Sequence, residues 1–560
     1  MGAAVVAAGL ALVVTACGGG SSSSSASASG SSSGSGSSGS IASTQGKTFP
    51  TLKVAWGDTD YMDPGLSYRL ESWQLFQDVY LTLVIKQHAN GPAGAKIVPG
   101  LAQSMPTVNK AGTDYKFTLR KGLKYSNGTP IKASDFEKTI VRDFKLNSPG
   151  IGFYSNIVGV DPCEKSPTKC TSIPGIVSND AAGTIEIKLK QPESDFLYVM
   201  SLFFSAPVPP TTPATPQGSP PPPGSGPYYI ANYSPHKSFT IKRNPHWQKG
   251  AIATVPDGNP DTVQGTILDD LAQSAQMVAS GQADYDENLL PSDRLAQYQK
   301  KYGSQIKYFT TPSTYYFFMN QRLAPFNNIK ARQAVNYAID RNQLVKLRGG
   351  LGKPTQNFLP PNYPQFKAIN YYKYDLNKAK QLVQQSGTKG QAVTVYTISD
   401  VSTDKAIGEY LQGVLKSLGY KASIRELAGG NYFTIVGNQS TKAQIGFTDW
   451  YEDYPYPTDW FNVLLNGEKI TQIHNNNYGN VDIKPLNKQM DQLAALPGSE
   501  ASSTGTNSKW AALDQAFVVK NASVAPFLNG VLTSFFSSRM NMSCDVFDDN
   551  QDDFAQFCLK

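Results

Sequence analysis

The chain has 560 residues, of which 40% are hydrophobic, and its 50 Lys and Arg residues exceed its 43 Asp and Glu residues to give a net charge of +7. Both signs of charge are interspersed and no block of Lys or Arg occurs, so the composition argues against a nucleic-acid-binding protein. Beyond residue 17 no apolar run approaches the roughly 20 residues of a transmembrane helix, so we expect the remainder to be soluble and globular.

The first predicted element is an apolar run at residues 3–16, which ends at Cys17. The run is too short to span a membrane and has the length of the hydrophobic region in a secretory signal. An apolar segment, small residues and then a lone cysteine resemble a bacterial lipoprotein signal, although no Lys or Arg precedes the run. We therefore expect residues 1–17 to be a signal peptide and Cys17 to carry a lipid anchor at the extracellular face of the cell membrane. The alternative is an uncleaved hydrophobic tail.

Residues 18–47 consist almost entirely of Gly, Ser and Ala. Such a segment cannot bury enough apolar surface to offset its chain entropy, so it is predicted to be disordered. About thirty residues of this composition reach an average of about 30 Å, which suits a flexible tether between an anchor and a folded body.

The body contains four cysteines, which fall into two pairs that are close in sequence. Disulfides within the pairs are the simplest of the three possible connectivities and are typical of an exported protein. A zinc site is the alternative, but the spacings contain no CxxC and no His lies near either pair. The predicted disulfides are Cys163–Cys170 and Cys544–Cys558.

The first part of the body reads as strands with turns between them. Residues 52–56 form an apolar opening strand, and residues 115–119 and 185–189 alternate between apolar and polar side chains, as half-buried strands do. Between the last two, Ser134 followed by Glu137 three positions later predicts a capping box at the start of a helix.

The middle of the chain reads as α/β. Apolar residues at helical spacing predict helices over residues 328–347, 375–385 and 404–418. Strands are predicted at residues 392–398 and 420–427, on either side of the last helix. This strand–helix–strand order predicts a parallel crossover.

Several segments, taken in order, resemble the extracellular solute-binding proteins of peptide-type ABC transporters, the oligopeptide- and dipeptide-binding family. The densest match runs through Pro-Gly-Leu-Ala and Tyr-Lys-Phe-Thr-Leu-Arg-Lys-Gly to Tyr-Ser-Asn-Gly-Thr-Pro and Ala-Ser-Asp-Phe. The resemblance covers about residues 50–540. The matching segments are residues 99–102, 115–122, 125–130, 133–136, 224–228, 242–247, 280–285 and 320–341, and residues 374–375 with 378–379.

The resemblance implies an α/β fold of the periplasmic-binding-protein type, namely a two-lobed, three-segment class II clamp with mixed sheets and a hinge. One lobe is discontinuous and carries an inserted domain, and the two lobes close over the ligand. The expected segments are residues 48–83, 196–307 and 526–560 for lobe I, residues 84–195 for the inserted domain II, and residues 308–525 for lobe II.

Residues 446–460 hold four acids and five Trp or Tyr residues, and their prolines predict a turn-rich loop. Aromatic walls with fixed carboxylates suit an extended amphipathic ligand that bears an ammonium group. The segment resembles the family's Gly-Trp…Asp-Tyr…Pro segment, in which the aspartate before the tyrosine holds a peptide's α-amino group.

On this resemblance Asp453 and Tyr454 take the family positions and Trp450 is the nearest match to the upstream aromatic residue. The spacing differs from the family pattern, so the choice among Asp449, Glu452 and Asp453 stays open. The alternative is that these acids are solvated or pair with nearby Lys and Arg residues to fix the loop.

Three further tyrosines are candidate ligand contacts because they fall where the chain of family members approaches the cleft. The alternative for each is a place in the core or the hinge. These residues are Tyr61, Tyr154 and Tyr315.

The sequence gives little support for an enzyme. None of its four histidines lies in an HExxH motif or beside a GxSxG elbow, and no P-loop or dinucleotide fingerprint occurs. Asp449 and Asp453 resemble a glycosidase carboxylate pair only in type, because four residues on one loop do not place them across a sugar ring. A secreted hydrolase is therefore a distant alternative.

We expect a membrane-anchored, monomeric protein that captures short peptides outside the cell and delivers them to the permease subunits of an ABC importer. No cofactor and no nucleic acid are expected. The alternative within the same fold is an oligosaccharide, a metal chelate or another small solute as ligand, because the fold does not fix the ligand.

Overall fold

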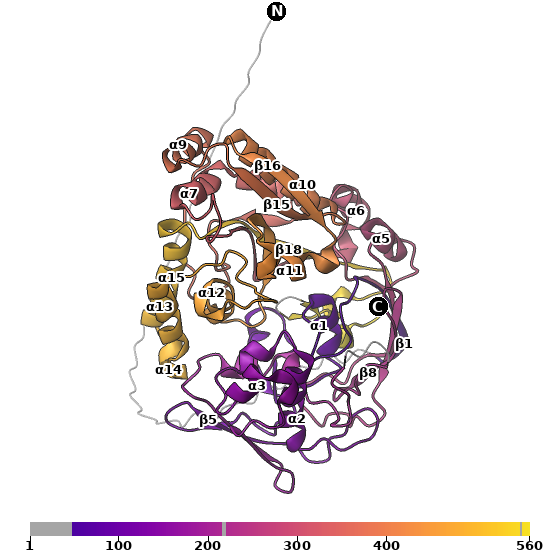
Figure 1. The fold of residues 1–560 in the computed structure, drawn as a ribbon. Helices are drawn as coiled ribbons and strands as arrows, with labels where there is room; N and C mark the ends of the chain where they lie inside the picture. Colours follow the sequence, from indigo (N-terminus) through magenta and orange to yellow (C-terminus); the bar gives the residue numbers. More distant parts are fainter. Residues whose placement is uncertain (1–46, 216–219, 549–550) are drawn as a thin grey trace, which may run out of the picture. The chain divides into compact units, whose positions relative to one another are not determined.

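The computed structural model describes residues 47–215, 220–548 and 551–560 (Figure 1). The predicted signal peptide, Cys17 and all of the predicted tether except residue 47 lie outside the described residues. None of the described helices combines the length and apolarity that crossing a membrane requires.

The main feature is a mixed sheet of twelve strands. Its first part has the order β11-β1-β10-β9-β8, in which β1 runs parallel to β10 and β11. The predicted opening strand is thus central, and its apolar residues are buried on both faces. The bounds are β1 Phe49–Trp56, β8 Tyr228–Ser234, β9 Ser238–Arg243, β10 Pro260–Ile267 and β11 Tyr285–Asp286.

The second part of the sheet has the order β16-β15-β17-β13. The predicted strand–helix–strand unit is confirmed, because β15 and β16 pair in parallel and α10 lies beside both (Figure 1). The chain turns from α10 towards β16 at Gly419, whose φ of 93° favours glycine. The bounds are β13 Ser313–Met319, β15 Ala392–Ile398, α10 Ser402–Ser417, β16 Lys421–Leu427 and β17 Ile445–Tyr451.

One long strand, β18 (Val524–Phe536), joins the two parts of the sheet. Its first residues pair with β13, and its last residues pair with β11 and with β12 (Ile306–Thr310). The chain also passes between the parts at Thr311, whose N–H donates to Gly530 O at 3.2 Å. Two neighbouring connections therefore link the two parts, and β14 (Gly352–Pro354) pairs with β18 between them.

A separate sheet of four strands lies within the segment that is predicted as an inserted domain. Its order is β4-β5-β7-β6, and α2 (Ser134–Leu146) buries Phe136, Ile140 and Phe144. The predicted domain boundaries themselves stay a prediction. The bounds are β4 Thr107–Val108, β5 Asp114–Thr118, β6 Ile176–Asn179 and β7 Thr184–Lys188.

Two local predictions are wrong. The predicted helix at residues 328–347 is interrupted, because the Asp340 side chain accepts hydrogen bonds from two backbone N–H groups and starts a second helix. The predicted capping box is absent, because the Ser134 N–H and hydroxyl bond to Asp180 while Glu137 accepts from Ile173 N. In both cases a tertiary or side-chain partner outweighs the local pattern.

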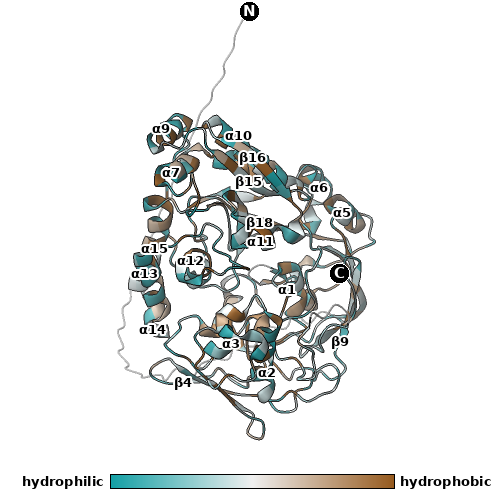
Figure 2. Ribbon diagram, viewed as in Figure 1, coloured by the Kyte–Doolittle hydropathy of each residue, from teal (hydrophilic) through white to brown (hydrophobic). Residues whose placement is uncertain are grey.

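The remaining helices are mostly short, and Figure 2 shows hydrophilic and hydrophobic residues side by side along them. The smaller paired strands are β2 Val84–Lys86 with β3 Ile97–Pro99 and β19 Phe547–Asp548 with β20 Gln551–Asp552. The helices are α1 Leu70–Phe76, α3 Asp161–Lys165, α4 Phe196–Val199, α5 Leu271–Ala279, α6 Leu295–Tyr302, α7 Ile329–Ala338, α8 Arg341–Leu347, α9 Leu376–Ser386, α11 Gly429–Val436, α12 Pro457–Leu465, α13 Lys484–Ala494, α14 Gly498–Ala501 and α15 Thr504–Gln515.

Both predicted disulfides are present, Cys163–Cys170 and Cys544–Cys558. Each closes a short loop, and a disulfide-bonded cysteine offers no thiolate to a metal ion. The alternative of a zinc site at these cysteines is therefore excluded.

Candidate functional site

The acid-rich segment at residues 446–460 is more regular than predicted. Strand β17 extends to Tyr451, and α12 begins at Pro457, so only residues 452–456 form a loop. Proline at the first position of a helix leaves no helical hydrogen bond unmade, so the residue that suggested a turn instead starts α12. The loop thus projects from the end of a buried strand, between two rigid elements.

Asp453 lies in this loop and is 8% exposed. Its Oδ2 accepts a hydrogen bond of 2.5 Å from the hydroxyl of Tyr68, which lies 385 residues earlier and just before α1. Its backbone N–H donates to Asp459 Oδ2 at 3.1 Å, and Trp450 Nε1 donates to the same oxygen at 3.1 Å. We call Tyr68, Trp450, Asp453 and Asp459 the Asp453 group.

The environment makes ionisation of Asp453 unfavourable. Burial raises the pKa of Asp453 to about 7, while the hydrogen bond from Tyr68 and the positive charge of Lys86 lower it. Burial and the negative charge of Asp453 raise the pKa of Asp459 well above its ordinary value. Of the two neighbouring carboxyls, Asp453 is therefore the one that ionises near neutral pH.

Aromatic rings surround the Tyr68–Asp453 hydrogen bond. The Tyr68 ring stacks on Trp73 with ring centres 5.5 Å apart and meets Phe204 edge-on at 5.3 Å. It also meets Trp450 edge-on at 6.2 Å. Residues from distant parts of the chain thus form one aromatic shell, which keeps the dielectric low and strengthens charge interactions with Asp453.

Tyr454 joins the loop to a different segment. Its hydroxyl donates to Asp195 Oδ2 at 3.0 Å, and the Thr458 hydroxyl also bonds to Asp195. Its ring stacks on Tyr198 with centres 6.0 Å apart. The Tyr454 side chain is 2% exposed, so the structure gives it contacts within the protein, and its role as a ligand contact stays a prediction.

A second group forms around Asp449, which pairs with Tyr315 across β17 and β13. Arg348 Nη2 donates to the Tyr315 hydroxyl at 2.6 Å, and Arg348 Nη1 lies 3.4 Å from Asp404 Oδ1. Burial and the charge of Asp404 raise the pKa of Asp449 to about 6, while Arg348 lowers it. Two acids beside one Arg favour a cation over an anion at this place.

The other predicted contacts lie in different surroundings. Glu452 is 2% exposed, and its hydrogen bond with Tyr363 is among the causes that raise the pKa of Tyr363, after burial. Tyr154 is buried and donates to Asp143 Oδ2 at 3.3 Å. Tyr61 is 41% exposed. None of these contacts joins the residue to the Asp453 group, so each role stays a prediction.

Sequence reasoning missed two members of the Asp453 group. In the sequence, Asp459 is one of the four acids of the segment and has no assigned role, although its position in the first turn of a Pro-initiated helix is a usable signal. No pattern in the sequence identifies Tyr68 as a member, because its hydrogen bond to Asp453 is a tertiary contact.

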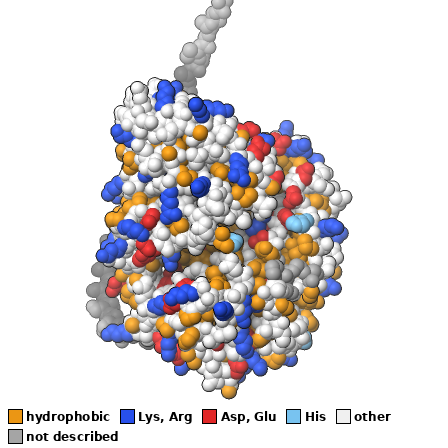
Figure 3. Space-filling model, in the orientation of Figure 1, with side chains coloured by type: hydrophobic (Ala, Val, Ile, Leu, Met, Phe, Trp, Pro, Cys, Tyr) orange, Lys and Arg blue, Asp and Glu red, His pale blue; other side chains and the backbone are white. Residues whose placement is uncertain are grey.

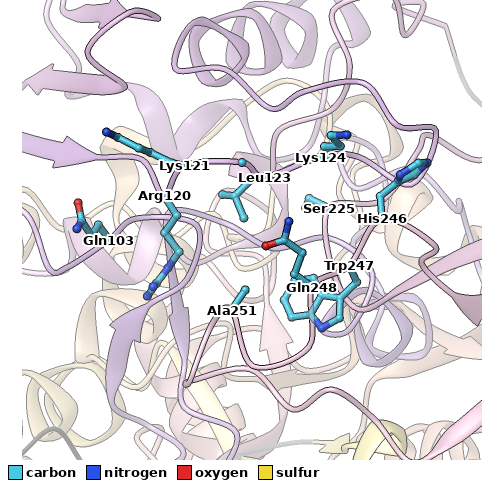
Figure 4. Close-up of a pocket in the computed structure, with 11 residues that line it drawn as sticks. Gln103, Arg120, Lys121, Leu123, Lys124, Ser225, His246, Trp247, Gln248 and Ala251 are labelled. Atoms are coloured by element: carbon cyan, nitrogen blue, oxygen red, sulfur yellow. The ribbon is translucent and has the colours of Figure 1, made fainter.

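The surface is hollowed near the middle of the face in Figure 3, in the region where Figure 1 draws α1, α11 and α12. Two cavities elsewhere have lining residues outside the Asp453 group. One, of about 420 Å³, is lined by Tyr115, Glu193 and Tyr198 among others. The other, of about 290 Å³, is lined by Arg120, Lys121, Lys124, His246 and Trp247 among others (Figure 4).

One group of described residues has the donor types of a metal site. Ligand atoms of Asp78, His88 and Asp553 lie within 4.8 Å of one another, and all three residues are buried. His88 Nδ1 lies 2.8 Å from Asp553 Oδ2. Burial raises the pKa of Asp553, but the charge of His88 and its hydrogen bond lower that pKa overall. A hydrogen bond inside the protein therefore accounts for the approach of His88 to Asp553.

Comparison with known proteins relates residues 96–472 of the body to one family. A model for the middle part of the bacterial extracellular solute-binding proteins of family 5 matches residues 96–472. The glutathione-binding protein GsiB of Escherichia coli O1:K1 is 26% identical over 372 residues, which are 62% of this chain and 65% of that protein. The match therefore spans just under two thirds of the length of this relative.

Solved structures show the same fold. The clavulanic acid biosynthesis oligopeptide binding protein 2 has a TM-score of 0.80 at 23% identity, covering 92% of this chain and 96% of that chain. The binding protein DppA from Helicobacter pylori, in complex with the peptide STSA, has a TM-score of 0.77 at 20% identity, covering 92% of this chain and 98% of that chain. The predicted two-lobed α/β clamp is confirmed as the fold.

Proposed function

Because the chain belongs to the bacterial extracellular solute-binding proteins of family 5, we propose that it captures short peptides outside the cell and delivers them to an ABC importer. The names of the similar proteins support this ligand class, since they include glutathione-binding and oligopeptide-binding proteins. The proposed activity is reversible binding of the peptide, in which no covalent bond is made or broken.

The observation that carries the proposal is the buried carboxyl of Asp453. Its pKa is raised to about 7, chiefly by burial, so the unliganded protein stabilises the charged form poorly. A peptide's α-ammonium supplies the missing charge and forms a charge-assisted hydrogen bond, which is roughly twice as strong as a neutral one. Asp453 is therefore an acceptor that gains most from a cationic donor.

The aromatic shell fits the same ligand. Trp450 and Tyr68 lie beside Asp453, and their rings offer contact area at a low cost in side-chain entropy. A peptide whose amino end meets Asp453 places its first side chain and main chain against such surfaces. Asp449 and Asp404, with Arg348 between them, offer a further polar contact for a basic group of the ligand.

Attachment to the membrane is part of the proposal. A lipid on Cys17, followed by the Gly-, Ser- and Ala-rich residues 18–47, keeps the binding protein within reach of the permease subunits. Two acyl chains are the usual requirement for stable anchoring, and a lipoprotein diacylglyceryl group provides both.

Titration of the purified protein with glutathione and with the peptide Ser-Thr-Ser-Ala tests the ligand class. We expect both to bind, and the N-acetylated form of Ser-Thr-Ser-Ala to bind at least about thirtyfold more weakly, because acetylation removes one partner of a buried charge pair. Calorimetry or intrinsic Trp fluorescence gives the affinities. Equal affinity for the free and the acetylated peptide contradicts an ammonium anchor, and absence of binding by both peptides contradicts the ligand class.

The affinity for a free-amine peptide should fall as the pH is lowered. The pKa of about 7 in the unliganded protein means that Asp453 is largely ionised at pH 7.5 and largely protonated at pH 5.5. Binding of an ammonium at low pH must first displace that proton, so we expect roughly twentyfold to thirtyfold weaker binding at pH 5.5 than at pH 7.5. Titrations of Ser-Thr-Ser-Ala at both values measure the change. The acetylated peptide is the control, and a free-peptide affinity that is constant or rises on acidification contradicts the prediction.

A further inference from the structure

We infer that the Tyr68 hydroxyl is a built-in competitor that occupies Asp453 in the unliganded protein and that every ligand must displace. Tyr68 thereby lowers the affinity of every ligand of the site by a common factor, so a cationic amine still binds tightly whereas a solute that offers only hydroxyl groups binds weakly. This inference rests on the proposed function, because it concerns the same carboxylate.

The Tyr68 hydroxyl takes the hydrogen-bonding position at Asp453 that we propose for a ligand amine. It comes from the loop before α1, whereas Asp453 comes from the loop before α12, so their hydrogen bond connects segments far apart in the chain. The Tyr68 hydroxyl donates to the carboxylate as a ligand amine would. Lys86, near the start of the chain's body, adds a positive charge that favours ionised Asp453. An ammonium group is both a hydrogen-bond donor and a positive charge. In the protein, Tyr68 supplies the donor and Lys86 supplies the charge.

The Tyr68 ring is fixed in this position. It stacks on Trp73, and Phe204 and Trp450 meet it edge-on. The Trp73 Nε1 donates to the backbone carbonyl of Ser67 at 3.0 Å, which holds the preceding residue in place. Burial raises the pKa of the Tyr68 hydroxyl well above its ordinary value, so it remains a proton donor at any physiological pH.

Displacement has different consequences for different ligands. A sugar hydroxyl that replaces the Tyr68 hydroxyl exchanges one neutral O–H donor for another and gains little at the carboxylate. An ammonium replaces a neutral donor by a charged one in a low-dielectric shell, where charge interactions are strengthened. The Tyr68 hydroxyl thus lowers the affinity of every ligand, and only ligands that bring a positive charge still bind tightly.

The competitor acts on the unliganded state, so its cost is common to all ligands of the site. When the binding-competent form is only a fraction of the free protein, the apparent dissociation constant of every ligand equals its intrinsic value divided by that fraction. Removing the hydroxyl should therefore tighten different ligands by the same factor and leave their relative affinities unchanged.

The test is Tyr68→Phe, which keeps the ring and its stacking but removes the donor. We expect several-fold tighter binding of both glutathione and Ser-Thr-Ser-Ala. Loss of a hydrogen bond to a charged group predicts a gain of about tenfold, and part of it is offset because the pKa of Asp453 is higher without the hydrogen bond from Tyr68. Stopped-flow fluorescence should show faster association and unchanged dissociation, because the competing contact exists only before binding. The acetylated peptide should gain by the same factor as the free one.

Tyr233→Phe is the matched control, because this buried tyrosine bonds through its hydroxyl to Thr59 Oγ1 at 2.9 Å and not to Asp453. It should leave both affinities unchanged. Unchanged or weaker binding by Tyr68→Phe, or a gain confined to dissociation, overturns the inference. If wild-type protein binds the free peptides and discriminates against the acetylated one, such a result overturns only the role of Tyr68. If wild-type protein binds neither peptide, the proposed function itself fails.

Discussion

Asp453→Ala should weaken the binding of Ser-Thr-Ser-Ala by at least about thirtyfold and by up to several thousandfold. Removing one partner of a buried, hydrogen-bonded charge pair typically costs about 2–5 kcal/mol, since the other charge is left desolvated without compensation. Asp453 is 8% exposed and lies beside the Tyr68 and Trp450 rings, so the charge pair is largely removed from solvent. Isothermal titration measures the loss directly.

Three further variants separate the charge from the shape and from the neighbouring acids. Asp453→Asn keeps the size and an acceptor for Tyr68, so a comparable loss attributes the effect to the charge. Glu452→Gln should change the affinity less than about threefold, because the hydrogen bond between Glu452 and Tyr363 directs that carboxyl to the protein. Asp449→Asn should have an intermediate effect at most. Full affinity in Asp453→Asn, or the largest loss in Glu452→Gln, contradicts the assignment.

The elements that sequence reasoning predicted correctly are those whose signals are local. Strand β15, helix α10 and strand β16 have uninterrupted periodicity and a glycine at the turn, so nothing distant was needed to predict them. The predictions that failed had competing partners. Asp180 takes the Ser134 groups that a capping box would use, and the Asp340 side chain starts a new helix where the apolar spacing suggested continuity.

The candidate site also combines features that the sequence predicts with contacts that it does not. The aromatic and acidic composition of residues 446–460 was visible in the sequence and identified the loop that carries Asp453. Its partner Tyr68 lies 385 residues away, and no spacing in the sequence relates the two. The same holds for Arg348 and Asp404, which meet only because α8 and α10 pack near each other. Composition can identify a loop as a candidate for binding, but the contacts that tune its chemistry arise from tertiary structure.

Asp63→Ala should lower the free energy of unfolding by about 3–5 kcal/mol. Arg142 holds Asp63 through both guanidinium nitrogens, at 3.0 Å to Oδ1 and 2.5 Å to Oδ2, and the side chains are 7% and 0% exposed. Arg142 Nε also donates to Pro213 O at 2.9 Å, so the guanidinium cannot swing out to water without breaking a further bond. Loss of the carboxylate leaves the buried Arg142 guanidinium, between α2 and the loop that follows β1, without its bidentate partner, and the remaining acid that interacts with it, Asp143, has a pKa that burial raises.

Urea unfolding followed by circular dichroism measures this change. Asp161→Ala is the matched control, because Asp161 pairs with Lys190 at 2.8 Å on the surface with 55% of its side chain exposed, and exposed pairs contribute little to stability. The double variant Asp63→Asn with Arg142→Met should recover much of the loss, since removing both charges removes the desolvation problem. The prediction is contradicted if Asp63→Ala is as stable as Asp161→Ala, or if the double variant is less stable than Asp63→Ala. Either result means that the Asp63–Arg142 pair does not stabilise the loop between β1 and Tyr68.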